Sequence, residues 1–186
     1  RADLERVADT AGGRLGGCDI LVANAGVADR IPLEKMTEAS FTEMVDLNVT
    51  SQWLLSKALF PLLSATESGR IINIASVYGV GASVVDGLGA YTVSKHALIG
   101  LTRSQAVEWA GFGITANAIA PSYFETEMTD SVLTNRKLSS TLKSFTPQHR
   151  FGRPPELATA LLFLASAASN YVNGAVVPVD GGWTAW

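Results

Sequence analysis

Tyr91 and Lys95 lie four residues apart in the run Ala90–Lys95. On a helix, side chains at this spacing share one face, with Cβ atoms about 5–6 Å apart. An ammonium about 4 Å from the phenol favours the phenolate by roughly 4 kcal/mol at an effective dielectric of about 20, or about three pKa units before desolvation opposes the shift. The pair predicts a tyrosine that exchanges protons near neutral pH, although the same spacing also arises by chance on helix surfaces.

Ser76 and Asn48 are two further polar residues whose side chains could take part in a reaction. Ser76 precedes Tyr91 by fifteen positions, across a loop with four glycines that can fold it back beside the phenol. Its hydroxyl would stabilise a developing oxyanion, or it would simply complete a turn at a strand end. Asn48 lies in the apolar run Val45–Val49, where a buried amide needs partners. It predicts either a hydrogen-bonded helix kink or part of a water relay.

Short apolar runs alternate with helical patterns along the chain. The apolar runs are Asp19–Ala23, Arg70–Ala75, Ile114–Ala120 and Ala175–Val179, and the helical segments are Thr37–Leu63, Tyr91–Ala110 and Pro155–Ala168. Continuous apolarity indicates strands buried on both faces, and the alternation with helices indicates βαβ units. We predict a single α/β domain over residues 1–186, built on a doubly wound parallel sheet.

The patterns between and before these runs give local expectations. The chain begins at Arg1 within an amphipathic helical pattern that stops at Gly12–Gly13. One face of that helix carries Leu4, Val7, Ala8 and Ala11. The segment Thr37–Leu63 should break near Asn48. Residues 122–150 are polar and irregular, which is typical of a mobile insertion or lid.

Reactive groups of a parallel sheet gather at the carboxyl ends of its strands. Asn24, Ala25 and Gly26 follow the first apolar run, Ser76 the second and Pro121-Ser122 the third, while Tyr91 opens the helix after the second. We therefore expect all of these residues at one rim of the sheet.

Composition excludes several classes of protein. With 47% hydrophobic and 17% charged residues and a net charge of −3, the chain is typical of a soluble globular protein without a nucleic-acid surface. The apolar stretch Ala160–Ala165 is too short to span a bilayer. Cys18 is the only cysteine, which fits a reducing, cytoplasmic compartment, and one cysteine with two histidines is a poor supply for a catalytic zinc site. We expect no metal.

The motifs in combination resemble the short-chain dehydrogenase/reductase family, of the type that includes sugar and polyol dehydrogenases and 3-oxoacyl thioester reductases. They occur in family order as Asn24-Ala25-Gly26, Asn48, Ser76, Tyr91 with Lys95, and Asn117–Pro121. The ending Gly181–Trp186 is similar to that of sugar and polyol dehydrogenases. The resemblance covers essentially the whole chain and implies a Rossmann-like fold.

The resemblance also implies an activity, namely NAD- or NADP-dependent hydride transfer that interconverts a small-molecule secondary alcohol and a ketone. It makes Tyr91 the proton donor or acceptor, and Ser76 the residue that orients the carbonyl. Lys95 would bind the nicotinamide ribose while lowering the pKa of Tyr91, and Asn48 would hold a relay water. The implied cofactor contacts are Asn24, Ala25, Gly26, Tyr91, Lys95, Pro121, Ser122, Phe124 and Thr126, with Thr126 on the carboxamide or a phosphate.

Three departures from the family pattern stand out. The glycine-rich phosphate turn is absent from the chain as given, Ser122 replaces the usual glycine after Pro121, and the loop between Ser76 and Tyr91 is slightly long. The family sheet would continue with three more strands beyond Asp19–Ala23, so we expect a fragment of a longer enzyme with an open apolar edge.

Other interpretations stay open. A non-catalytic scaffold or inactive fragment is the main alternative, because half of the cofactor site is not in the sequence. A serine hydrolase is disfavoured because Gly81–Val85 lacks the second glycine of a nucleophile elbow. Basic residues of the lid would steer an anionic substrate or merely solvate a helix; they are Arg136, Lys137, Lys143 and Arg150. Trp53 and Trp109 are large for solvent-facing helices, so we expect a homotetramer or homodimer.

Overall fold

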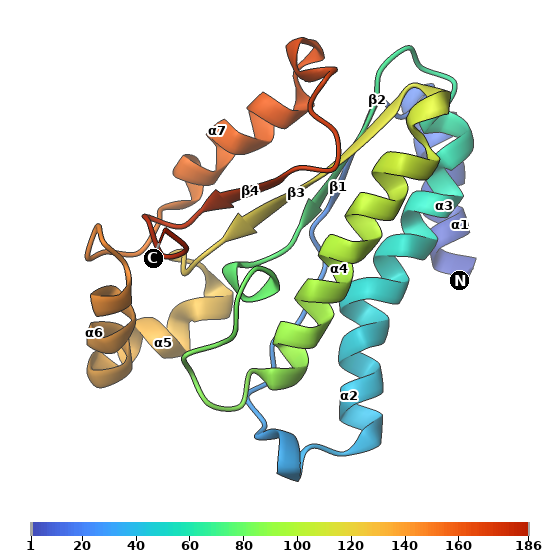
Figure 1. The fold of residues 1–186 in the computed structure, drawn as a ribbon. Helices are drawn as coiled ribbons and strands as arrows, with labels where there is room; N and C mark the ends of the chain where they lie inside the picture. The colour runs from blue at the N-terminus through green and yellow to red at the C-terminus, as the bar shows by residue number, and fades with distance from the viewer. Residues whose placement is uncertain (1, 186) are drawn as a thin grey trace.

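Four parallel strands form one sheet in the order β1-β2-β3-β4 (Figure 1). The computed structural model describes residues 2–185. The strands are β1 (Ile20–Ala23), β2 (Gly69–Ile74), β3 (Ile114–Pro121) and β4 (Val176–Val179). Leu21 pairs with Ile71, Ile71 with Ala116, and Ala118 with Val176. The predicted strands are thus confirmed to within one residue at each end.

Helices cover both faces of this sheet, as expected for a doubly wound fold (Figure 1). The α-helices of the described residues are α1 (Ala2–Thr10), α2 (Glu38–Val45), α3 (Ser51–Leu63), α4 (Gly89–Glu108), α5 (Asp130–Thr134), α6 (Arg136–Phe145) and α7 (Pro154–Ala165), of which α5 and α6 lie beyond the end of the sheet. The helices α3 and α4 lie on one face, with α1 packed on α3, while α7 lies on the other.

The core is split by the alternation of side chains along the strands. Ile71 and its neighbour Ile72 are both buried, but Ile71 packs with Leu63 of α3 and Ile72 with Leu164 of α7. Successive residues of a strand point to opposite faces, so a strand covered on both sides must be apolar throughout. This explains why the buried strands are continuous apolar runs in the sequence.

Small residues on β3 let α4 approach the sheet closely. Ala116 and Ala118 are fully buried, and Ile99 of α4 packs on Ala118. Because α4 lies over β3 and β2, its first turns reach the carboxyl end of the sheet. That is where Tyr91 and Lys95 are located.

β1 is one of the two edge strands of the sheet within the described residues. Leu21 and Ala23 are buried, whereas Ile20 and Val22 on the opposite face are 46% and 40% exposed. β1 pairs only with β2 in the described part of the chain. The expected open apolar edge is therefore present in residues 2–185.

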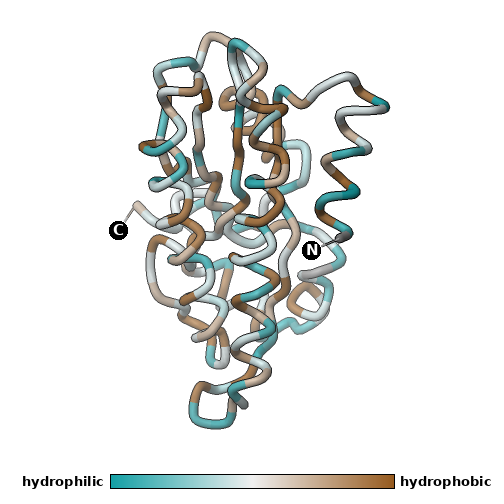
Figure 2. The backbone as a smooth tube through the Cα atoms, turned by 90° about the vertical axis from the view of Figure 1, so that its right-hand side faces the viewer, coloured by the Kyte–Doolittle hydropathy of each residue, from teal (hydrophilic) through white to brown (hydrophobic). Residues whose placement is uncertain are grey.

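The segment before β1 matches the predicted helix with two differences. Figure 2 shows alternating hydrophobic and hydrophilic bands along α1, next to the N label. Ala8 and Ala11 pack against the core below α3, but Val7, predicted on the same face, is exposed. The helix also does not stop at Gly12–Gly13: a wider π-helical turn continues to Leu15 and ends at Gly16, whose φ is +77°.

Two other regions are more regular than expected. The segment Thr37–Leu63 does not break near Asn48 but widens into a π-helical turn, Asp46–Thr50, between α2 and α3. Residues 122–150 contain the helices α5 and α6 rather than an irregular loop. Asn135 caps α6, because its side chain accepts a hydrogen bond from Leu138 N at 3.1 Å.

The buried leucine at the end of α3 should be a major contributor to stability. Leu63→Ala leaves a void in the core under β2, so we expect the free energy of unfolding to fall by about 2–5 kcal/mol. Leu162→Ala on α7 is the matched control, since Leu162 is 70% exposed and should change stability by less than about 0.5 kcal/mol. Urea unfolding of both variants measures the difference, and equal losses would contradict this division of the core.

Candidate active site

The residues with predicted chemistry meet at the carboxyl end of β2. Ser76 follows this strand in an extended conformation, with φ −169° and ψ 160°, and its Oγ accepts a hydrogen bond from Tyr78 N at 3.1 Å. Tyr91 lies in the first turn of α4. Both line one cavity of about 150 Å³, so the prediction that the loop folds Ser76 back beside the phenol is confirmed.

Gly79 makes this approach possible. A Cβ on Gly79 would lie 2.7 Å from the carbonyl oxygen of Lys95 and 2.9 Å from Ile99 Cδ1. Only glycine lets the turn after Ser76 pack directly on the backbone of α4. The loop and the helix α4 are thereby held together close to Ser76 and Tyr91.

Lys95 is almost completely buried beside this cavity. Its Nζ donates a hydrogen bond to the carbonyl oxygen of Ile74 at 2.8 Å and lies 5.6 Å from the centre of the Tyr91 ring. Desolvation lowers the pKa of Lys95 to about 8. The ammonium is therefore largely charged at neutral pH and close to the range in which it loses its proton.

Burial is also the first cause acting on Tyr91, and it raises the pKa of the phenol above its ordinary value. A hydrogen bond with the Ser76 side chain opposes the rise, and the charge of Tyr78 adds to it. The lowered pKa of Tyr91 that we predicted from Lys95 is therefore wrong in direction for this structure. The sequence reveals the spacing of the pair but not the cost of enclosing it.

Asn48 is fully buried in the π-helical turn and joins three segments. Its Oδ1 accepts a hydrogen bond from Val27 N at 2.8 Å, and its Nδ2 donates to Val27 O and Ser94 Oγ, both at 2.9 Å. Of the two predicted roles, these bonds show the hydrogen-bonded helix distortion directly. The loop after β1 is held to α4 through this one amide.

Gly26 packs closely against the side chains of Asn48 and Lys95. A Cβ there would reach 3.0 Å from Asn48 Oδ1 and 3.6 Å from Lys95 Nζ. The backbone of the preceding residues is fixed as well, because Gln52 Nε2 donates to Ala25 O at 2.6 Å. Asn24 and Ala25 are exposed directly after the carboxyl end of β1.

The predicted residues after β3 divide into two groups. Ser122 follows Pro121 and lines the cavity of Ser76 and Tyr91, together with a second cavity of about 130 Å³ shared with Phe124. Ser122 does not have a positive φ, so serine replaces the family glycine without backbone strain. The Phe124 side chain is buried and packs on Gly152, and Thr126 is exposed outside both cavities.

Sequence reasoning missed several residues of the first cavity. Ala28 and Arg30 come from the loop after β1, Tyr78 from the turn after Ser76, and Thr129 and Ser131 from the segment around α5. Arg30 follows Gly26 by four residues, so its place just beyond a strand end was an available signal. Trp109, which we expected at a contact between subunits, packs against Phe60 of the same chain with ring centres 5.0 Å apart.

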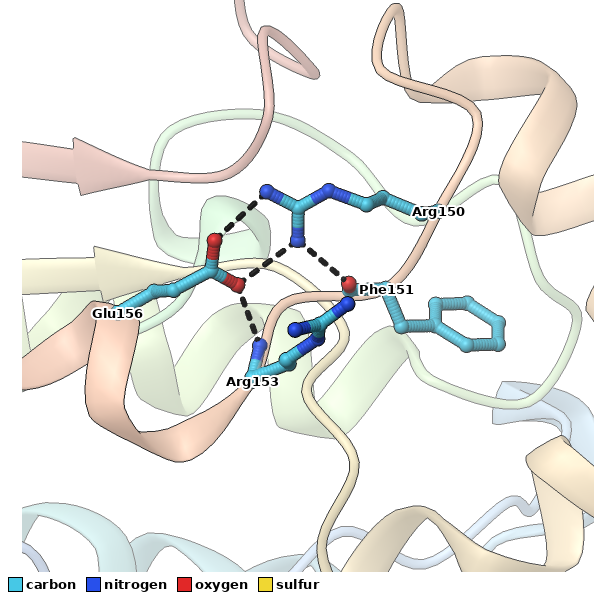
Figure 3. Close-up of polar contacts among 4 residues, drawn as sticks. All are labelled: Arg150, Phe151, Arg153 and Glu156. Carbon is cyan, nitrogen blue, oxygen red and sulfur yellow. Dashed lines mark hydrogen bonds and ion pairs between the residues drawn. The ribbon is translucent and has the colours of Figure 1, made fainter.

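A second polar cluster fastens residues 122–150 to α7 (Figure 3). Arg150 binds Glu156 through two hydrogen bonds of 2.7 Å, and Glu156 Oε2 also accepts one from Arg153 N at 2.8 Å. The hydrogen bonds from Arg150 lower the pKa of Glu156 to about 2. Arg150 thus anchors the return of this segment, and Lys143 lies 5.0 Å from the Phe151 ring centre. Two of the four basic residues suspected of steering a substrate therefore contact the fold instead.

The sequence matches a family model described as Enoyl-(Acyl carrier protein) reductase over residues 1–184. It is 41% identical over 168 residues to galactitol 2-dehydrogenase of Rhizobium johnstonii, covering 90% of this chain and 65% of the relative. The chain belongs to the short-chain dehydrogenase/reductase family. This confirms the resemblance drawn from the motifs.

Other relatives match at similar identity. The 2-dehydro-3-deoxy-D-gluconate 5-dehydrogenase of Bacillus subtilis is 39% identical over 165 residues, which are 89% of this chain and 64% of the relative. The crystal structure of a gluconate 5-dehydrogenase from Burkholderia cenocepacia, in complex with NADP and tartrate, is 36% identical with a TM-score of 0.93, covering 100% of this chain and 72% of that one. The chain spans just under two thirds of the length of the two curated relatives.

The Asn48 bonds lead to a stability prediction. Asn48→Ala leaves the partly buried N–H and carbonyl of Val27 without their Asn48 partner, so we expect the free energy of unfolding to fall by about 1–3 kcal/mol. Ser94→Ala removes only one bond of Asn48 and should cost about 0.5–1.5 kcal/mol. Thermal or urea unfolding compares the two, and a smaller loss for Asn48→Ala would contradict its role as the link between the loop and α4.

Proposed function

We propose that the protein interconverts a secondary alcohol and a ketone with NAD or NADP, by hydride transfer. The observation that carries the proposal is the shared cavity of Ser76 and Tyr91, with the buried ammonium of Lys95 beside it. Relatives of the family are dehydrogenases, which supports the same activity for the protein that carries this chain.

The residues present fit a nicotinamide cofactor at the rim. Gly26 packs against Asn48 and Lys95, which places the Nζ of Lys95 next to the loop after β1, and this Nζ supplies donors for ribose hydroxyls. Asn24, Ala25, Gly26 and Lys95 would hold it on one side, and Pro121, Ser122, Phe124 and Thr126 on the other. When bound, the cofactor supplies or accepts the hydride.

Proton transfer falls to Tyr91. Because burial raises the pKa of its phenol, Tyr91 is protonated at neutral pH and acts as the acid when a ketone is reduced. In reduction, the phenolic proton of Tyr91 would pass to the carbonyl oxygen, and Ser76 would donate a hydrogen bond to the same oxygen. In oxidation, the phenolate takes the alcohol proton. The charge of Lys95 stabilises that phenolate, and Asn48 would hold a water that exchanges protons with Lys95.

The cavity suits a hydroxylated substrate. Ser76, Ser122, Thr129 and Ser131 bring hydroxyl groups to its wall, which can match the hydroxyls of a sugar-derived molecule. The named activities of the relatives concern polyols and sugar acids, which supports the same substrate range here. Residues 122–150, which contribute part of this wall, would act as the lid.

A homo-oligomer belongs to the same proposal. Trp53 is 41% exposed on α3 with Lys57 Nζ 5.4 Å from its ring centre, and Val107 on α4 is strongly exposed. An exposed apolar surface of this kind fits a second copy of the chain as a dimer or tetramer. No helix of residues 2–185 is long and apolar enough to cross a membrane. Cytoplasmic residence, suggested by the lone Cys18, remains part of the proposal.

Removal of the Tyr91 hydroxyl tests the central assignment. We expect Tyr91→Phe to reduce kcat/KM by at least about 100-fold, since a general acid contributes about 100- to 10,000-fold, while NADH and NADPH affinity stays nearly intact. Tyr171→Phe is the control, because Tyr171 is fully exposed and outside the cavity. Steady-state rates and fluorescence titration of the cofactor give both quantities. Retained turnover would support the alternative of a non-catalytic scaffold.

Lys95 should be needed for both cofactor binding and turnover. We expect Lys95→Met to weaken NADH or NADPH binding and to abolish turnover, because it removes the ribose donor and the buried charge together. Cofactor titration separates this result from that of Tyr91→Phe. Unchanged cofactor affinity in Lys95→Met would contradict the ribose contact.

The pH dependence follows from the same two groups. The pKa of Lys95 is lowered to about 8, so the ammonium is present below pH 8 and is lost as the pH rises through that value. Because the phenolic proton of Tyr91 is also needed for reduction, kcat/KM for a ketone should fall above about pH 8 and stay level below it. Rates of ketone reduction between about pH 6 and 10 at saturating cofactor check this. A kcat/KM for the ketone that rises with pH would contradict it.

A further inference from the structure

Arg30 is the only residue with a charged side chain among the described residues that line the cavity of Ser76 and Tyr91. No aspartate or glutamate lines it. In the described part of the chain, the Arg30 side chain also forms no salt bridge, since the ion pairs there join Arg6 with Asp3 and Arg150 with Glu156. One guanidinium is thus presented to the cavity without a counter-charge from its wall.

The backbone of Arg30 is fixed against the loop that carries Ser76. Ile31 N donates a hydrogen bond to Gly87 O at 3.0 Å. Gly87 has a φ of +83°, and a Cβ on it would lie 2.9 Å from the carbonyl carbon of Arg30. Only glycine fits this contact, so the loop after β1 is held to the loop between Ser76 and Tyr91. Arg30 is therefore positioned by the fold at the entrance of the site.

Two phenols lie within electrostatic reach of Arg30. Burial raises the pKa of both Tyr78 and Tyr123, and the charge of Arg30 is among the causes that oppose the rise. Their hydroxyls are 3.0 Å apart, so one donates a hydrogen bond to the other. The cavity therefore offers a cation and two phenols in addition to Ser76 and Tyr91.

We infer that Arg30 is a specificity-determining residue that binds the carboxylate of an anionic substrate, a hydroxy acid or its keto acid. The inference rests on the proposed function, because Ser76 and Tyr91 are taken as the reacting end of the cavity. A guanidinium presents paired N–H donors that match the two oxygens of a carboxylate. One cation balances its single charge, whereas a phosphate ester carries about −1.5 to −2. A neutral polyol would leave the charge of Arg30 without a counter-charge in the cavity.

The test compares substrates that differ only in charge. Aldonates and alditols of the same configuration, namely gluconate with glucitol and mannonate with mannitol, are oxidised with NAD and with NADP. We expect the enzyme to prefer the aldonate of a pair. Arg30→Met should lower kcat/KM for the aldonate by about 10- to 100-fold, the effect of losing one charge-assisted hydrogen bond, and leave the alditol within about threefold. Arg30→Lys should fall between the two, because it keeps the charge but not the planar fork.

Arg136→Met is the matched control, since it removes an exposed arginine from α6 that does not line the cavity. It should change neither rate. Equal losses for aldonate and alditol in Arg30→Met, or an enzyme that oxidises the alditol as well as the aldonate, would overturn the role of Arg30 while leaving the oxidoreductase proposal intact. Absence of turnover with every pair and both cofactors would overturn the proposed function and this inference with it.

Discussion

The hydrogen bond between the Lys95 ammonium and the Ile74 carbonyl is the contact on which the site depends. It joins α4 to the carboxyl end of β2 at 2.8 Å, inside a nearly dry environment. A buried charge is costly unless it is hydrogen-bonded, so the helix cannot rotate or slide without losing this partner. Ser76 lies two residues beyond Ile74 and Tyr91 one helical turn before Lys95. The single contact therefore fixes both groups relative to each other.

The same burial decides the electrostatics of the pair. At a surface, the Lys95 charge would lower the pKa of Tyr91, because water solvates both groups and the Coulomb attraction remains. Here desolvation is the largest cause for each residue, raising the pKa of the phenol and lowering that of the amine. Both shifts favour the neutral forms. The phenol of Tyr91 is therefore kept protonated, which suits a proton donor for ketone reduction.

The parts that sequence predicts well are those set by local spacing. Continuous apolar runs such as Ile114–Ala120 identify strands covered on both faces, and the four-residue step from Tyr91 to Lys95 needs only a helix to bring them together. Burial by distant segments is not visible in this way. Trp109 is covered by Phe60 of another helix, and α6 was missed because Ser and Thr within it obscure the Leu138 and Leu142 spacing.

Arg30 could not be assigned to the site from the sequence, because it lies in a loop. It also shows that the residues proposed for substrate recognition come from other segments than those proposed for the reaction. The proposed reacting groups follow β2 and lie at the start of α4, whose geometry is held by the core, so their motif is regular in sequence. The recognition groups come from loops: Arg30 after β1, Tyr78 after Ser76 and Tyr123 after β3. They meet only because backbone contacts such as Ile31 to Gly87 join those loops in three dimensions. Such loops can change without disturbing the strands beneath them, so one reaction centre can serve substrates of different charge.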